Sequence, residues 1–164
     1  MEQNAKEKVI EYKILLIGDS DSNKTPIFYK IIYGKSYKPT LSTIGVDFES
    51  KNFIYKNKKY SIKLFDIAGQ ERFRSIRKAY WHMGNGFFVV FNLSNEQSLY
   101  SIKEWIDSIE KEIQNPKIVI LGHETQSNYN IPDDIINQYL KNYSKYTIIS
   151  LIYYFYLDSK NKIY

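Results

Sequence analysis

The sequence contains no cysteine. This absence excludes disulfide bonds, thiolate metal sites and a lipid carried on a cysteine side chain. A membrane-spanning run is also missing, because the apolar stretch at residues 146–157 is too short to cross a bilayer. The first residues, MEQNAKEKVIEYK, are charged and lack the apolar core of a secretion signal. Together these features predict a cytosolic protein without a stable membrane anchor.

Arginine is scarce and occurs only at positions 72, 74 and 77. The net charge of +5 therefore comes almost wholly from lysines, which are spread along the chain. Scattered lysines favour a solvated surface over the concentrated basic patch of a nucleic-acid-binding protein. Histidine is also rare, and His82 and His123 have no partners at metal-ligand spacing. We interpret both as solvated or loop residues.

Length and apolar pattern predict one α/β domain. The chain has 164 residues, 43% of them hydrophobic, so residues 1–164 can form a single domain with a real core, and 1–8 are expected to be disordered. Strands are expected at 12–17, 43–48, 53–55, 60–65, 86–93, 117–122 and from 146 onward, with a turn at 57–58. Helices are expected at 26–33, 75–83, 94–113 and 133–143. Their alternation predicts a three-layer fold with a mostly parallel central sheet.

A polar loop separates the first expected strand from the first expected helix. It reads Gly18-Asp19-Ser20-Asp21-Ser22-Asn23-Lys24-Thr25. A strand, a polar loop, Lys-Thr and a helix follow each other in this order in phosphate-binding loops. Pro26 in the first helical turn is tolerated, because the early N–H groups have no partners within the helix. Lys-Thr alone would favour an ordinary helix start, so the other motifs must decide.

The second motif lies in KLFDIAGQERFR, residues 63–74. Asp66 ends a strand, where its carboxylate can hold Mg²⁺ directly or through water. Gly69 lets a backbone N–H approach a phosphate oxygen, and the side-chain amide of Gln70 can donate to and accept from a water molecule. Alone, this pattern favours a strand that ends in a turn. With the phosphate loop and Thr43 it makes three loops, which a parallel sheet brings to its carboxyl edge.

These segments resemble the Rab family, which belongs to the Ras superfamily of small GTPases. The matching stretches are YKILLIGDS at 12–20, STIGVDF at 42–48, KLFDIAGQERFRSI at 63–76 and the stretch from Tyr80 to Phe91. The resemblance runs from about residue 12 to residue 122. It implies a P-loop small-GTPase fold and a GTP/GDP switch of vesicle trafficking that hydrolyses GTP with Mg²⁺.

The resemblance also implies a role for each matching residue. Lys24 would bridge the β- and γ-phosphates of the nucleotide. Thr25 and Thr43 would ligate Mg²⁺, and Asp66 would hold the metal through water. The remaining phosphate-loop residues would bind the nucleotide, and Gly69 would give an N–H to the γ-phosphate.

Catalysis and partner binding would fall to neighbouring residues. By the same resemblance, Gln70 would orient the attacking water. The segments from Ile44 to Phe48 and from Arg72 to Ile76 match the switch surfaces that Rab effectors and regulators contact. The resemblance implies a monomer.

The phosphate loop departs from the family pattern in three places. The family has glycine where this chain has Asp21 and Asn23. Asparagine tolerates a left-handed backbone, but an aspartate places a carboxylate beside the phosphates. Pro26 removes an N–H that binds the α-phosphate in the family. The aromatic that covers guanine is replaced by Ser36, with Tyr37 one position displaced.

The base-recognition motif departs further. The family pattern is Gly-Asn-Lys-x-Asp, whereas this chain reads Gly122-His123-Glu124-Thr125-Gln126. The family aspartate accepts two N–H groups from guanine, and the amide of Gln126 adds donors of the wrong sense. A later Ser-Ala-Lys motif is reduced to Ser150-Leu151-Ile152, and the last helix is expected to be shortened.

The departures predict weakened nucleotide binding and leave three interpretations. The first is a Rab-like GTP-binding switch with impaired binding. The second is a nucleotide-independent binding module that uses the switch surface. The third is a non-functional, truncated gene product. Uptake of guanine nucleotide separates the first two, and the third predicts no stable protein.

Overall fold

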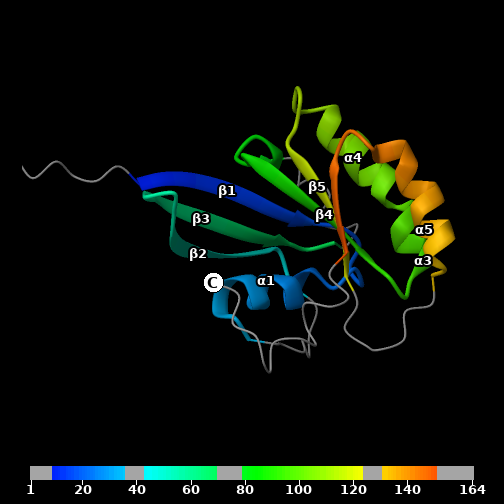
Figure 1. The fold of residues 1–164 in the computed structure, drawn as a ribbon, viewed down its shortest axis with the longest axis horizontal. Coiled ribbons are helices and arrows are strands. Elements are labelled where there is room, and N and C mark those ends of the chain that lie inside the picture. The colour runs from blue at the N-terminus through cyan, green and yellow to red at the C-terminus, as the bar shows by residue number, and fades with distance from the viewer. Residues whose placement is uncertain (1–8, 36–42, 70–78, 124–130, 151–164) are drawn as a thin grey trace, which may run out of the picture.

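A six-stranded sheet forms the centre of the fold (Figure 1). The computed structural model describes residues 9–35, 43–69, 79–123 and 131–150. The strand order is β2-β3-β1-β4-β5-β6, with β2 antiparallel to β3 and the other neighbouring strands parallel. The strands are β1 (Val9–Ile17), β2 (Val46–Tyr55), β3 (Lys58–Ile67), β4 (Gly86–Asn92), β5 (Ile118–His123) and β6 (Thr147–Ser150). The mostly parallel sheet predicted from the sequence is confirmed.

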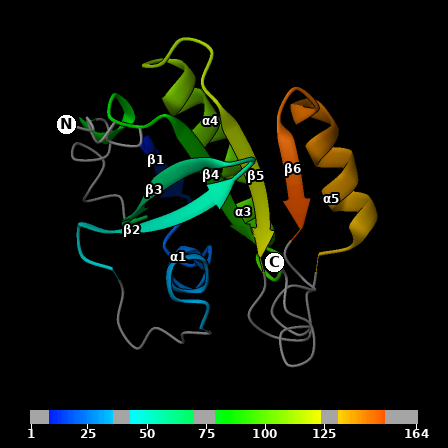
Figure 2. The same ribbon diagram turned by 60° about the vertical axis from the view of Figure 1, so that its left-hand side comes forward.

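Helices cover both faces of the sheet and complete the three layers. α1 (Lys24–Tyr33) lies on one face, and α3 (Glu96–Tyr100), α4 (Ile102–Glu110) and α5 (Asp133–Leu140) lie on the other (Figure 1). A 3₁₀ turn, η2 (Lys141–Tyr143), follows α5. Figure 2 shows β6 at the end of the sheet beside β5, with α5 beyond it.

Alternation along β1 divides the core between the two faces. Leu15 and Ile17 are fully buried in the larger apolar cluster, which includes residues of α3, α4 and α5. Leu16, between them, is fully buried in the smaller cluster that includes Ile27 and Phe28 of α1. Successive side chains of a strand point to opposite faces, so the end of β1, which is covered on both faces, is apolar at every position from Ile14 to Ile17.

The predicted helix at 94–113 is two helices. Its apolar positions Leu99, Ile102, Ile106 and Ile109 are buried as expected, but the helix breaks at Ser101. The Ser101 hydroxyl donates to the carbonyl of Gln97 at 3.0 Å. A serine that competes in this way for the carbonyl one turn earlier bends a helix.

The hairpin turn lies one residue earlier than predicted. Lys56 and Asn57 both have positive φ angles, 46° and 56°, and join β2 to β3. Two-residue hairpin turns need such left-handed residues, because that backbone twist matches the twist of the flanking strands. The expected short helix at 75–83 is described only from residue 79, and the shortened last helix and residues 1–8 lie outside the described ranges.

Within the four described ranges, no helix is long and apolar enough to span a membrane.

Candidate functional site

Three segments far apart in sequence meet at the carboxyl edge of the sheet. The first is the loop between β1 and α1, the second is the segment just before β2, and the third follows β3. β1 and β3 are parallel neighbours, so both end at this edge (Figure 1). β2 runs antiparallel to β3 and therefore begins there.

The three residues predicted to hold Mg²⁺ lie in direct contact. The Thr25 hydroxyl donates to Asp66 Oδ2 at 2.5 Å and lies 2.9 Å from the Thr43 hydroxyl. Thr43 Oγ1 also donates to Asp66 Oδ2, at 3.4 Å. Side chains 18 and 41 residues away from Thr25 thus converge on one point.

Asp66 carries a buried charge that this cluster does not fully satisfy. Its side chain is 1% exposed, and Oδ1 has no hydrogen-bond partner among the residues that the structure describes. Burial raises the pKa of the Asp66 carboxyl above its ordinary 3.8, although the hydrogen bond from Thr25 and the charge of Lys24 oppose this. One carboxylate and two hydroxyls are hard oxygen donors of the kind that Mg²⁺ prefers. The donor set therefore fits the metal that the sequence predicts.

The raised pKa of Asp66 gives the ligand-free protein a testable pH dependence. When folding raises the pKa of a carboxyl, its stabilising contribution is complete below about pH 4 and is lost as the pH rises through the folded-state pKa. We expect Asp66→Asn to remove this loss. Its free energy of unfolding should exceed that of the unmodified protein by a margin that grows with pH.

Urea unfolding from pH 4 to pH 7, without nucleotide or Mg²⁺, measures this difference. Asp134→Asn, which removes an exposed carboxylate at the start of α5, is the matched control. A difference from the unmodified protein that stays constant with pH would show that Asp66 is not the group responsible.

The phosphate loop wraps around the ammonium group of Lys24. This side chain is 5% exposed. Its Nζ donates to the carbonyls of Gly18 at 2.9 Å and Asp19 at 2.5 Å, and to Ser22 Oγ at 3.3 Å. The ammonium group is thus held by two backbone oxygens and one side-chain oxygen of the loop that, in phosphate-binding loops, surrounds the phosphates that the lysine reaches.

Backbone geometry explains the residue types at Asn23 and Gly69. Asn23 adopts the left-handed conformation with φ 65°, which asparagine tolerates better than most residues with a side chain. Gly69 lies directly against the loop, since a Cβ there would be 2.4 Å from the Asp19 carbonyl carbon. Only glycine fits this contact, which holds the segment after β3 against the phosphate loop.

Three further residues hold the loop and were missed by the sequence analysis. Trp105 Nε1, on α4, donates to Asp19 Oδ1 at 2.8 Å. Asn92 Nδ2 donates to the Asp21 carbonyl at 3.1 Å, and Asn95 Nδ2 donates to Asp21 Oδ2. Asn92 and Asn95 could have been predicted from the sequence. β4 is also a parallel neighbour of β1, so these polar residues at the end of β4 lie at the same edge of the sheet.

His123 overturns one prediction. It is the last residue of β5 and is fully buried, so it is not a solvated or loop histidine. Its carbonyl accepts from the Leu93 N–H at 3.1 Å. A histidine directly after an apolar run can still belong to the strand when both faces of the sheet are covered. His82, by contrast, has a side chain that is 63% exposed, as predicted.

Several predicted site residues lie outside the described ranges, and their roles stay predictions. These are Gln70, the segment from Arg72 to Ile76, Glu124, Gln126, Ser36 and Tyr37. Ser150 is the last residue of β6 and therefore lies near the same sheet edge.

The predicted partner surface presents apolar side chains beside the site. Ile44 is 79% exposed and Phe48 is 59% exposed. The Phe48 ring stacks on Phe65 with centroids 5.5 Å apart, and Phe65 lies 6.3 Å from Tyr80. A row of packed aromatic rings that is exposed at one end suits a protein-binding surface.

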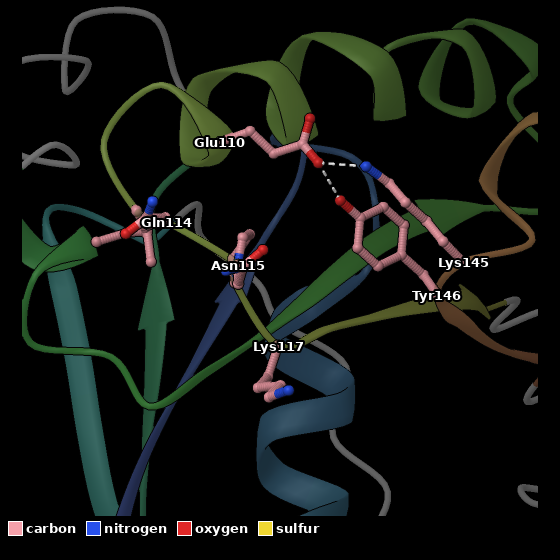
Figure 3. A pocket seen from close by; sticks show the side chains of 8 residues that line it. Glu110, Gln114, Asn115, Lys117, Lys145 and Tyr146 are labelled. Carbon is pink, nitrogen blue, oxygen red and sulfur yellow. Dashed lines mark hydrogen bonds and ion pairs between the residues drawn. The ribbon is translucent and has the colours of Figure 1, made fainter.

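A separate pocket of about 410 Å³ lies at the opposite end of β5 and β6 (Figure 3). Glu110 Oε1 accepts hydrogen bonds there from Lys145, at 2.6 Å, and from the Tyr146 hydroxyl. These two bonds hold the pKa of Glu110 below its ordinary value. Glu110, Lys145 and Tyr146 thus bind one another, and the pocket is remote from the phosphate loop.

Comparisons with known proteins agree with this geometry. A family model described as the Ras family matches residues 13–146. The human Ras-related protein Rab-27A is 34% identical over 125 residues, covering 69% of this chain and 57% of that protein. Bovine Ras-related protein Rab-8B is 36% identical over 118 residues, covering 71% of this chain and 57% of that protein. The chain thus spans little more than half the length of the relatives it matches.

Proposed function

The chain belongs to the Ras family as a Rab-like member, and on that premise we propose that it is a GTP/GDP switch of vesicle trafficking with weakened nucleotide binding. The observation that carries the proposal is the convergence of Thr25, Thr43 and Asp66 on one point beside Lys24. This arrangement leaves a buried carboxylate oxygen of Asp66 without a partner among the described residues.

The Mg²⁺ ligands, Lys24 and the base-recognition motif would each contribute differently to nucleotide binding. Thr25, Thr43 and Asp66 would hold Mg²⁺, which supplies charge neutralisation to the phosphates when bound. Lys24 is the one cationic residue among residues 18–25, and its ammonium group would bind the phosphates. The altered motif from His123 to Gln126 would hold the base poorly. Each lost charged or backbone hydrogen bond costs about 1–3 kcal/mol, so several of them lower affinity by decades.

Hydrolysis of GTP to GDP and phosphate would rest on Gln70 orienting a water molecule, by resemblance to the family. Unaided hydrolysis is slow even in an intact member, on the order of 10⁻⁴ per second for Ras. The exposed side chains of Ile44 and Phe48 support binding of effectors or regulators at the surface from Ile44 to Phe48.

A second candidate function is a binding module that needs no nucleotide. The exposed apolar side chains of Ile44 and Phe48 favour it, because a protein-binding surface of this kind needs no nucleotide chemistry.

Nucleotide titration tests the proposal and its base selectivity. We expect GTP to bind no tighter than the micromolar range and to be preferred over ATP by less than about tenfold, because Gln126 offers one amide oxygen where a carboxylate offers two. Gln126→Asp, combined with His123→Asn and Glu124→Lys, should raise the preference for GTP by about tenfold or more.

The same exchange at a remote site, Gln114→Asp in the pocket of Figure 3, should leave the preference unchanged. A thousandfold preference for GTP in the unmodified protein would show that this motif is not the base reader. Failure to bind any nucleotide would refute the switch and favour the nucleotide-independent module.

A further inference from the structure

We propose that Asn95 is a positioning residue that holds the Asp21 carboxylate against the turn before α3, so that this charge does not oppose phosphate in the loop. The proposal rests on the proposed function for its effect on nucleotide binding. The contact between the two side chains involves no nucleotide atom, so it can be tested separately.

The orientation of Asn95 is fixed by its own helix. Asn95 is the N-cap of α3, and its Oδ1 accepts from the N–H groups of Gln97 at 3.0 Å and Ser98 at 3.4 Å. Because the oxygen must face these donors, the amide nitrogen must face the other way. In that direction it donates to Asp21 Oδ2. Asn95 therefore caps α3 with its side-chain oxygen and donates to the phosphate loop with its side-chain nitrogen.

Asn92 holds the backbone of the same residue. Its Oδ1 accepts from the Ser94 N–H at 2.9 Å, which again fixes the side-chain amide. Its Nδ2 donates to the Asp21 carbonyl at 3.1 Å. Both the carbonyl and the carboxylate of Asp21 are thus bound to one short turn at the end of β4. Asn92 thus fixes the backbone of Asp21, and Asn95 binds its carboxylate.

The charge balance of the loop explains why this matters. Residues 18–25 contain two carboxylates, Asp19 and Asp21, and one ammonium group, Lys24, so the loop carries a net charge of −1. Trp105 already binds the carboxylate of Asp19. A freed Asp21 carboxylate could turn toward Lys24 and compete with phosphate for it, and it would repel the phosphate directly. Asn95 donates a hydrogen bond to the Asp21 carboxylate, as Trp105 does to the Asp19 carboxylate.

A double-mutant cycle between Asp21 and Asn95 isolates this interaction. Asn95→Ser retains a good N-cap acceptor but removes the amide donor. We expect it to weaken binding of GTP with Mg²⁺ by about tenfold, because the released Asp21 carboxylate would repel the phosphates. In the Asp21→Ser background, the same change should alter the affinity by less than about twofold. Gln97→Ser, at an exposed position of the same helix, is the matched control and should bind as the unmodified protein does.

Equal losses from Asn95→Ser in both backgrounds, or no loss in either, would overturn the proposal. If the unmodified protein binds no nucleotide, the proposed function fails. Thermal unfolding without ligand then tests whether Asn95 binds Asp21. Asn95→Ser should then lower the melting temperature by about 2–4 °C with Asp21 present and by much less with Asp21→Ser. Equal shifts in the two backgrounds would show that Asn95 does not act through Asp21.

Discussion

Replacing Gly18 by alanine is expected to lower the melting temperature by about 10 °C or more and to abolish nucleotide binding. A Cβ at this position would lie 2.2 Å from the Val90 carbonyl oxygen and 2.7 Å from Ser22 Oγ. The backbone φ of +145° is also one that side chains rarely adopt. The Val90 carbonyl belongs to a buried central strand, so it cannot move aside cheaply. The phosphate loop would have to move instead, and with it the ring of oxygens around Lys24.

Gly34→Ala is the matched control for this prediction. Gly34 ends α1 with a positive φ of 67°, but a Cβ there meets no atom within 4 Å. Its cost should be about 1 kcal/mol, or a few degrees of melting temperature. Both variants strain a backbone with positive φ, but only Gly18→Ala places a Cβ against β4. The difference between their melting temperatures therefore measures the cost of that contact. A Gly18→Ala protein that melts within a few degrees of the control would contradict the described contact between the loop and the sheet.

The Mg²⁺ ligands could be predicted from the sequence because they depend only on topology. Apolar runs before Gly18 and around Asp66 indicate buried strands, and parallel strands end at one edge. Any polar residue at those strand ends must then lie close to its counterparts. Thr25, Thr43 and Asp66 are in contact for this reason, whatever the details of side-chain packing.

The two partners of the loop carboxylates differ in how far they could be predicted. Asn95 follows β4 directly, so the strand order alone brings it to the edge where the phosphate loop lies. Trp105 lies 86 residues from Asp19, and its contact depends on where α4 packs and on the helix break at Ser101, which helical periodicity does not show. His123 was misjudged because its side chain is polar, although its position in the covered strand β5 decides its burial.

The second large effect is expected at Asp66. Its carboxylate is the anionic member of the Thr25–Thr43–Asp66 set, so Asp66→Asn leaves that set with no negative charge. Neutral oxygens alone hold Mg²⁺ weakly in competition with water. Binding of GTP in EDTA should change little, because Lys24 and the loop backbone remain. The strengthening of GTP binding by Mg²⁺ should be lost.

The most direct measurement is the affinity for GTP in Mg²⁺ and in EDTA, for the unmodified protein, Asp66→Asn and the exposed-site control Asp134→Asn. The account predicts that Mg²⁺ strengthens binding by at least about tenfold in the unmodified protein and in the control, and by less than about twofold in Asp66→Asn. GTP binding that is the same with Mg²⁺ and with EDTA in the unmodified protein would contradict it. So would a Mg²⁺ effect that persists undiminished in Asp66→Asn.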